Sequence, residues 1–159
     1  MKCTTYEQAV ARYGAIDVVA RQWPDGGQWM ATFDVPDNVE RGWVNSFTQK
    51  PTTRIYCNKD IHSALAQALQ NLKNADLLSE LKTYDGCFEI RPVRGRPGRV
   101  STHAYGLALD INASENGLGQ PPRLSAPFVK CWTDAGFDWG GDFARKDGMH
   151  FSFAWEGVP

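Results

Sequence analysis

The sequence predicts one α+β domain: a largely antiparallel sheet with helices packed on it and a small β meander near the N-terminus. A length of 159 residues suits one domain. Hydrophobic residues make up 42% and charged residues 22%, a mixture that can bury a core without cross-links. Periodicity orders the elements as helix, short strands, helix, and then strands with one more helix inserted. We place the motif-bearing core at about residues 54–155 and an N-terminal cover segment at residues 1–53.

Two helices are predicted in the first half of the chain. Residues 4–13 form the first, with Thr4 or Thr5 as its N-cap. Residues 60–73 form the second, because apolar side chains recur there at spacings of three and four. Residues 75–81 can add a further turn or two.

Residues 21–50, between these helices, carry aromatic side chains spread among prolines and glycines. This composition indicates a meander of short strands and turns that covers the main core. We expect the aromatic side chains to pack in the core, and a ligand-binding platform is the alternative. The aromatic residues are Trp23, Trp29, Phe33, Trp43 and Phe47.

The second half of the chain alternates strand and helix patterns. Two stretches repeat at period two, which is typical of half-buried strands. An apolar stripe capped by Ser125 and ended by Gly136 predicts a helix. The predicted elements are a strand at 87–91, a loop at 92–100, strands at 106–111 and 149–155, and a helix at 126–135.

Charge and hydropathy exclude several classes of protein. A net charge of −1 argues against a dedicated nucleic-acid binder. No apolar run approaches the roughly 18–20 residues of a membrane span, so we expect no stable membrane association. The N-terminus has no apolar signal core, so we expect synthesis in the cytoplasm without a signal peptide. We expect a monomer.

The four cysteines are scattered and form no CxxC pair. A chain with this much core does not need disulfides, so we expect reduced, buried packing residues. They are Cys3, Cys57, Cys87 and Cys131.

Two of the three histidines have a setting that suits a metal. His103 precedes the strand at 106–111, and His150 lies in the strand at 149–155. The first strand has one face of Gly, Ala and Asp110, which is a poor core face but leaves room beside a carboxylate. Two imidazoles and a carboxylate form a common ligand set for a catalytic zinc. His62, next to the apolar stripe of its helix, is expected to be a surface or boundary residue.

A zinc site of this kind needs a base close to the metal but not bound to it. Asp147 lies three residues before His150, in a turn to which Gly148 gives conformational freedom, and it is the candidate. The alternative is that both histidines are ordinary hydrogen-bonded residues and the aspartates are turn formers. Asp138 and Asp142 can orient the histidines or form turns, and the sequence leaves both open.

Two stretches carry a family resemblance. One follows the pattern Ser-x-His-x-x-Gly-x-Ala-x-Asp, and the other combines Trp-Gly-Gly with an acidic residue three positions before His-Phe. The matching residues are Ser101, His103, Gly106, Ala108, Asp110, Trp139, Gly140, Gly141, Asp147, His150 and Phe151. From about residue 87 to residue 153, the chain resembles the zinc peptidases that include D-alanyl-D-alanine carboxypeptidases, VanX- and VanY-type enzymes and phage L-alanyl-D-glutamate endolysins.

The resemblance implies a role for each of these positions. It makes His103, Asp110 and His150 the zinc ligands and Asp147 the catalytic base. The use of aspartate as the base resembles the endolysin branch of these peptidases. It also implies an arginine that stabilises the oxyanion, for which Arg91 is preferred and Arg94 is second. The substrate-binding residues that it implies are Arg94, Ser101 and Tyr105.

The arginine cluster of the 92–100 region has two interpretations. Arg91, Arg94, Arg96 and Arg99 fall within one short stretch without interleaved aromatics, which does not favour a nucleic-acid patch. A solvated basic loop accounts for at least two of them. Peptidoglycan stem peptides carry carboxylates, which gives the others a reason to be cationic.

The resemblance therefore implies a zinc-dependent peptidase of the peptidoglycan stem peptide, closest to L-alanyl-D-glutamate endopeptidases. The nearest alternative is a D-alanyl-D-alanine carboxypeptidase or dipeptidase. A non-catalytic wall-binding or virion structural protein is a further alternative, with the tryptophan-rich region at 21–50 as its working surface. As an endolysin, the protein would reach the wall after release through the inner membrane by a holin, or from a virion.

Overall fold

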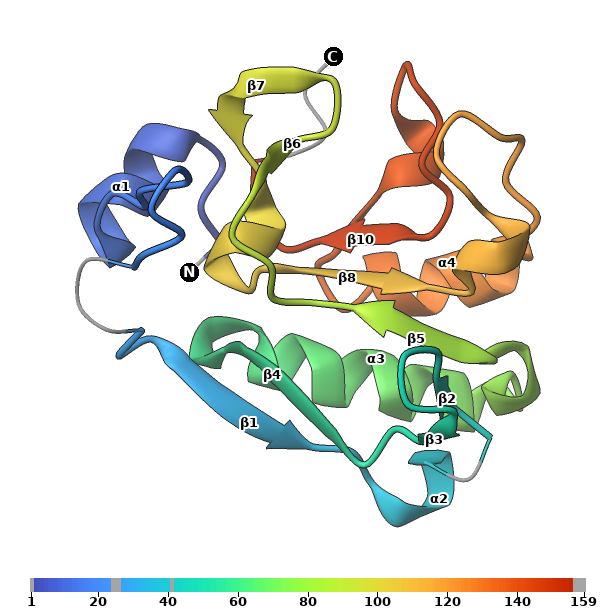
Figure 1. Cartoon of the computed structure of the whole chain (residues 1–159). Coiled ribbons are helices and arrows are strands. Elements are labelled where there is room, and N and C mark those ends of the chain that lie inside the picture. The colour runs from blue at the N-terminus through green and yellow to red at the C-terminus, as the bar shows by residue number, and fades with distance from the viewer. Residues whose placement is uncertain (1, 24–26, 41, 156–159) are drawn as a thin grey trace.

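A six-stranded mixed sheet forms the centre of the fold in the computed structural model, which describes residues 2–23, 27–40 and 42–155 (Figure 1). Its strand order is β3-β2-β5-β8-β10-β9, and β2 and β5 are its one parallel pair in the described part of the chain. Two further antiparallel pairs, β1 with β4 and β6 with β7, lie outside this sheet. The strands are β1 Met30–Asp34, β2 Val44–Asn45, β3 Lys50–Pro51, β4 Arg54–Asn58, β5 Thr83–Gly86, β6 Pro92–Val93, β7 Arg96–Val100, β8 Ala108–Ile111, β9 Asp138–Trp139 and β10 His150–Ser152.

Four α-helices and several short 3-10 turns complete the described fold. Helices α3 and α4 pack against each other on one side of the central sheet, and the β6–β7 hairpin rises on the other side (Figure 1). This arrangement confirms the predicted α+β class. The helices are α1 Tyr6–Tyr13, α2 Asp37–Glu40, α3 His62–Asn74 and α4 Ala126–Thr133, and the 3-10 turns are η1 Lys59–Ile61, η2 Leu78–Glu80, η3 Thr102–Tyr105, η4 Ala113–Glu115 and η5 Gly140–Asp142.

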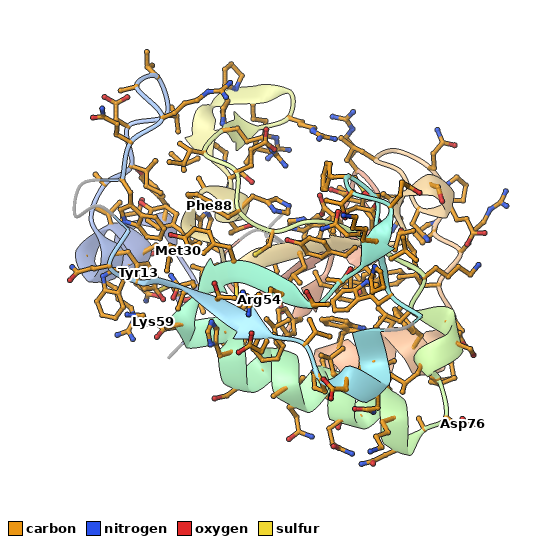
Figure 2. All side chains as sticks on the ribbon, turned by 60° about the horizontal axis from the view of Figure 1, so that its bottom comes forward. Tyr13, Met30, Arg54, Lys59, Asp76 and Phe88 are labelled. Atoms are coloured by element: carbon orange, nitrogen blue, oxygen red, sulfur yellow. The ribbon has the colours of Figure 1, made fainter. Side chains whose placement is uncertain are left out.

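The predicted helices form with the expected caps. The hydroxyl of Thr5 accepts a hydrogen bond from Gln8 N at the start of α1, and that of Ser125 accepts one from Phe128 N at the start of α4. Helix α3 lies between Lys59 and Asp76, which are labelled near its two ends in Figure 2. Its apolar stripe is buried and packs toward α4 and the sheet; the stripe comprises Ala64, Leu65, Ala68, Leu69 and Leu72.

The region at 21–50 differs from a simple meander in how its strands pair. Strand β1 pairs with β4, and the β2–β3 hairpin joins the central sheet through β5. The short helix α2 also interrupts the strands. Trp23 and Trp43 are buried in the core, as expected, whereas Phe47 is 74% exposed. Residues 24–26 and 41 lie outside the described part of the chain.

The predicted strand at 87–91 is wrong, and the predicted loop at 92–100 forms a hairpin instead. Strand β5 ends at Gly86, where the backbone has φ +128° and the register with β8 shifts. The next residues are extended but bond to the η3 region: Glu89 N donates to His103 O. The hairpin β6–β7 then turns at Gly95, which has φ +79°. The strand predicted at 149–155 is shorter than expected: β10 ends at Ser152, and the backbone N–H of Ala154 donates to the Ser152 hydroxyl.

All four cysteines are buried free thiols, in agreement with their predicted packing role. Among the described residues, no helix is long and apolar enough to cross a membrane.

A charged contact joins α1 to the start of α3. Oδ2 of Asp60 accepts hydrogen bonds from Arg12 Nε at 2.7 Å and from the Tyr13 hydroxyl at 2.6 Å. Burial raises the pKa of Asp60, but these hydrogen bonds lower it more, so its pKa lies below the ordinary value. The ionised carboxylate therefore stabilises the folded state.

We predict that Asp60→Asn lowers the free energy of unfolding at pH 7 by about 1–3 kcal/mol, the usual value of hydrogen bonds to a charged group. Because the folded-state pKa is depressed, the stabilisation is present above the unfolded pKa of about 4 and is lost as pH falls through the folded-state pKa. Urea unfolding at several pH values between neutral and strongly acidic should show the difference shrinking with acid. The control is Asp34→Asn, which removes an exposed pair with Arg54 and should have almost no effect. A difference that stays constant with pH would contradict the charge argument.

Candidate metal centre

Two facing residues of strands β8 and β10 begin the site. Asp110 and His150 are direct partners in the antiparallel register, so their side chains lie on the same face of the sheet. The backbone bond from Ile111 N to Met149 O makes 110 and 150 a non-hydrogen-bonded pair, the type in which side chains approach most closely. Leu109 and Phe151 point to the opposite face and are fully buried. The packing of that face therefore fixes the position of the two site residues.

His103 reaches the same place from the 3-10 turn η3. The Ser101 hydroxyl caps this turn by accepting a hydrogen bond from His103 N. Gly106 ends the turn with φ +64°, a left-handed conformation. A Cβ atom at Gly106 would also lie 2.9 Å from Asn58 N, so the site needs glycine there for space as well. The fixed serine and glycine of the first pattern thus set the position of the histidine between them.

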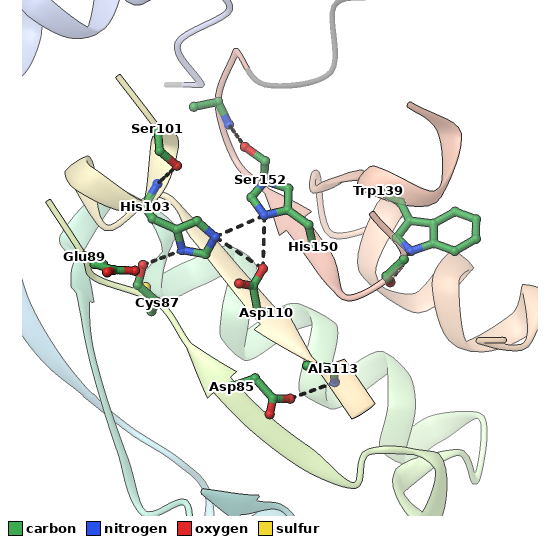
Figure 3. Close-up of polar contacts among 12 residues, drawn as sticks. Asp85, Cys87, Glu89, Ser101, His103, Asp110, Ala113, Trp139, His150 and Ser152 are labelled. Carbon is green, nitrogen blue, oxygen red and sulfur yellow. Dashed lines mark hydrogen bonds and ion pairs between the residues drawn. The ribbon is translucent and has the colours of Figure 1, made fainter. Parts of the chain in front are cut away.

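Three nitrogen and oxygen atoms of His103, Asp110 and His150 converge (Figure 3). His103 Nε2 lies 3.1 Å from His150 Nδ1. Asp110 Oδ1 lies 3.3 Å from His103 Nε2 and 3.1 Å from His150 Nδ1. All three residues are buried. Their donor atoms lie within 4.8 Å of one another.

A hydrogen bond behind His103 sets its tautomer. His103 Nδ1 lies 2.7 Å from the carbonyl oxygen of Cys87 (Figure 3). Because a carbonyl can only accept, Nδ1 carries the hydrogen, and in the neutral imidazole Nε2 then presents a lone pair on the side of Asp110 and His150. This is the usual arrangement behind a metal-binding histidine. The acceptor is a backbone carbonyl, not either of the aspartates that the sequence left open.

The electrostatics of the cluster favour an ionised Asp110. Burial alone would raise its pKa, but His103 and His150 outweigh burial, and the pKa of Asp110 lies far below the ordinary value. A buried carboxylate oxygen, an imidazole lone pair and a second imidazole nitrogen form a donor set that suits a zinc ion. The residues present therefore fit a metal, and they would hold it through His103 Nε2, Asp110 Oδ1 and His150 Nδ1.

Asp147 lies beside this cluster because two chain segments approach closely. The carbonyl oxygen of Gly140 accepts hydrogen bonds from the backbone N–H groups of Asp147 and Phe143. A Cβ atom at Gly140 would collide with the Asp147 carbonyl oxygen and would lie 3.1 Å from the Cβ atom of His150. A Cβ atom at Gly141 would collide with the Trp139 ring. The two glycines after the tryptophan thus allow the turn that carries Asp147 to pack against η5.

Gly148 is required for space and not for the conformational freedom predicted from the sequence. Its φ is not positive, and a Cβ atom there would lie 2.9 Å from the Cβ atom of Pro122. Its carbonyl oxygen accepts a hydrogen bond from the Trp139 indole at 2.8 Å (Figure 3). Trp139 therefore fixes the end of the turn that begins at Asp147.

The carboxylate of Asp147 has the properties of a base. Its Oδ1 is buried and has no hydrogen-bond partner among the described residues. Burial raises its pKa above the ordinary value, and the charge of Asp110 raises it further, whereas His150, His103 and Arg94 lower it. A half-buried carboxyl group with a raised pKa, beside a candidate metal site, is suited to proton transfer.

The cluster lies in a cavity of about 230 Å³ that also contains most of the other predicted site residues. Arg91, Arg94 and Ser101 line it together with Asp147. Arg91 is held in place, because its Nε lies 3.0 Å from a Glu89 carboxylate oxygen and its Nη1 donates to Pro92 O. Ser101 is buried and its hydroxyl caps η3, so its clearest role is to position His103.

Tyr105, which the resemblance implies to be substrate-binding, is not among the residues that line the cavity. It is fully buried, and its hydroxyl donates to the Gly14 carbonyl at 2.9 Å. Its ring packs against Tyr13, Trp23 and Trp155. The short η3 turn places His103 and Tyr105 on different sides, so only the histidine faces the sheet cluster.

The structure also places Asp138, Asp142 and His62, and it adds Arg145 to the cavity wall. Asp138 forms an ion pair with Lys2 at 2.8 Å, whereas Asp142 is exposed and lines the cavity. Arg145 lines the cavity as well and was missed, because it is far in sequence from the arginines of the hairpin and belongs to no recognisable pattern. His62 lies on α3 against the Phe33 ring, outside the cluster, as expected.

We predict that the wild-type protein binds about one zinc per chain, as sites with three protein ligands do. Elemental analysis should show the metal in the wild type and in the control His62→Ala, and should show its loss in the His103→Ala, His150→Ala double variant. Free zinc at about 100 times its Kd should raise the free energy of unfolding of the wild type and of His62→Ala by about 2.7 kcal/mol. Full zinc occupancy in the double variant would refute the ligand set.

One comparison with known proteins bears on this site. No curated protein and no solved structure matches the chain significantly. Residues 94–153, which contain all three candidate ligands and Asp147, match the family model of D-alanyl-D-alanine carboxypeptidase.

Proposed function

We propose that the protein is a zinc-dependent peptidase that hydrolyses an amide bond of the peptidoglycan stem peptide. The observation that carries the proposal is the unpartnered carboxylate oxygen of Asp147 in the same cavity as the converging atoms of His103, Asp110 and His150. A cluster of ligands with a base beside it suits hydrolysis better than structural metal binding. The family match over residues 94–153 supports the same reaction class.

The residues have separable tasks in such a reaction. When bound, zinc would supply Lewis-acid polarisation of the substrate carbonyl and would lower the pKa of water. Asp147 takes a proton from the attacking water and returns it to the leaving amine. Arg91 supplies fixed positive charge for the developing oxyanion, because its two hydrogen bonds hold it at the cavity wall. Arg94 has no such bonds and is the second candidate.

Among peptidoglycan bonds, we propose the L-alanyl-D-glutamate bond, on the resemblance of the aspartate base and its surroundings to phage endolysins. The second candidate is a D-alanyl-D-alanine carboxypeptidase, and the description of the matching family favours it. As an endolysin, the enzyme is made in the cytoplasm and reaches the wall through a holin or from a virion.

A purely wall-binding role has less support. The proposed working surface was the aromatic region at 21–50, yet Trp23 and Trp43 are buried there. Their ring surfaces serve the core and leave no platform for a sugar or peptide. Phe47 alone of the region's large hydrophobic side chains is strongly exposed among the described residues.

The test of the proposed function is digestion of purified muropeptides with the zinc-loaded protein, followed by mass analysis of the products. A free L-alanine end on the glycan side and a peptide that begins with D-glutamate would identify the endopeptidase. Release of one D-alanine would identify the carboxypeptidase. Unchanged muropeptides after chelator-free incubation would refute both.

We predict that Asp147→Asn is folded and zinc-loaded but slower by a factor of about 10²–10⁴, the usual contribution of a general base. The asparagine has the same size but cannot accept the proton at neutral pH. The loss should lie in kcat and not in substrate binding. Asp142→Asn, in the same cavity but exposed, is the matched control and should keep its turnover. If Asp147→Asn instead loses zinc, the residue is a ligand and its role here is wrong.

A further inference from the structure

The cavity above the metal cluster carries a strong excess of positive charge. Five of the chain's ten arginines are among the described residues that line it, and no described lysine is. Their five charges exceed those of the three lining aspartates by two, although the whole chain has a net charge of −1. These arginines are Arg91, Arg94, Arg96, Arg99 and Arg145.

Four of the five guanidinium groups form no ion pair within the described part of the chain. Arg91 pairs with Glu89, but the other four form no ion pair or hydrogen bond with any described residue. All four side chains are exposed, so water screens the repulsion between them and an anion that enters the cavity can reach them. Their concentration at one cavity therefore points to an anionic occupant and not to folding stability.

The arginines come from two walls. Arg94, Arg96 and Arg99 lie on the β6–β7 hairpin, and Arg145 comes from the segment between η5 and β10 (Figure 1). The two walls meet above the cluster, since Arg145 Nη1 lies 3.4 Å from the position of a Cβ atom on Gly95. A ligand in the cavity thus meets guanidinium groups from both sides.

The chemistry of the walls favours carboxylates on a peptide. Arginine binds carboxylate through two parallel hydrogen bonds, which lysine cannot do. Nucleic-acid grooves add aromatic rings on which bases stack, whereas Phe143 is the only such ring among the described lining residues, histidines aside. In the proposed function, the floor with Asp147 and the candidate metal ligands acts on an amide bond.

We propose that the hairpin arginines and Arg145 select stem peptides that carry at least two free carboxylates near the scissile amide, and that the enzyme discriminates against peptides whose carboxylates are amidated. This inference rests on the proposed function and names its substrate class. The arginines of the hairpin bind one carboxylate, and Arg145 binds another from the opposite wall.

The test uses two synthetic stem peptides that differ only in their side carboxylates, which are free in one and carboxamides in the other. Wild-type kcat/KM is measured for both, and calorimetry gives both Kd values with the non-cleaving Asp147→Asn variant. We expect the amidated peptide to lose about tenfold or more per carboxylate in each measurement, as is usual for bonds between charged groups.

The arginines are tested by Arg99→Gln and Arg145→Gln, each combined with Asp147→Asn for calorimetry. Each should weaken binding of the free-carboxylate peptide by about tenfold and leave binding of the amidated peptide nearly unchanged. Arg54→Gln is the matched control, because Arg54, which Figure 2 labels, lies exposed on β4 and is not among the residues that line the cavity. It should leave the binding of both peptides unchanged.

Equal cleavage and equal binding of the two peptides would overturn the inference and leave the proposed function intact. Losses of the same size for both peptides in Arg99→Gln and Arg145→Gln would also overturn it. If neither peptide is cleaved, the proposed function fails. The ratio of the two Kd values from calorimetry then still decides whether the cavity prefers free carboxylates. Tight binding of a short oligonucleotide with no binding of either peptide would show a phosphate site instead.

Discussion

The pairing of Asp110 with His150 across β8 and β10 is the constraint on which the site depends. A slip of one residue in this register would turn both side chains to the opposite face of the sheet. The register is held by the large apolar side chains of the same strands, Leu109 and Phe151, which are fully buried on the helix side. The hydrophobic core thus determines where two charged or polar groups meet, and His103 completes the cluster only because η3 ends at Gly106.

The position of Asp147, the candidate base, depends on a different physical cause, the absence of side chains at three glycines. Gly140, Gly141 and Gly148 each leave space that a Cβ atom would fill with a collision or near-collision. Without that space the Asp147 turn could not pack on η5, and Trp139 could not bond to the Gly148 carbonyl. The Trp-Gly-Gly pattern therefore acts through packing: it places the Asp147 carboxylate beside the candidate metal ligands.

The sequence predicted the features that arise from local signals and failed where distant segments decide. Helices α3 and α4 could be predicted because their apolar residues recur at helical spacing and their ends carry capping residues. The candidate ligands could be predicted because histidine and aspartate stand out on strand faces that otherwise carry small side chains. The parallel pairing of β2 with β5 could not be predicted, because it joins segments about 40 residues apart with no local mark. The hairpin β6–β7 was masked by its arginine, proline and glycine content, which is typical of loops. Tyr105 was misplaced because proximity in sequence to His103 does not mean the same side of a 3-10 turn.

One arginine of the cavity, Arg94, also affects the candidate base Asp147. Burial and the neighbouring Asp110 both favour the protonated form of Asp147, which is inactive as a base, whereas Arg94 and the two histidines favour the ionised form. Arg94 forms no ion pair with Asp147, and its influence does not cancel the increase that burial and Asp110 cause, so the pKa of Asp147 stays above the ordinary value. Arg94, Arg96, Arg99 and Arg145 are exposed and form no ion pair with a described residue, so they are available to the carboxylates of the proposed substrate.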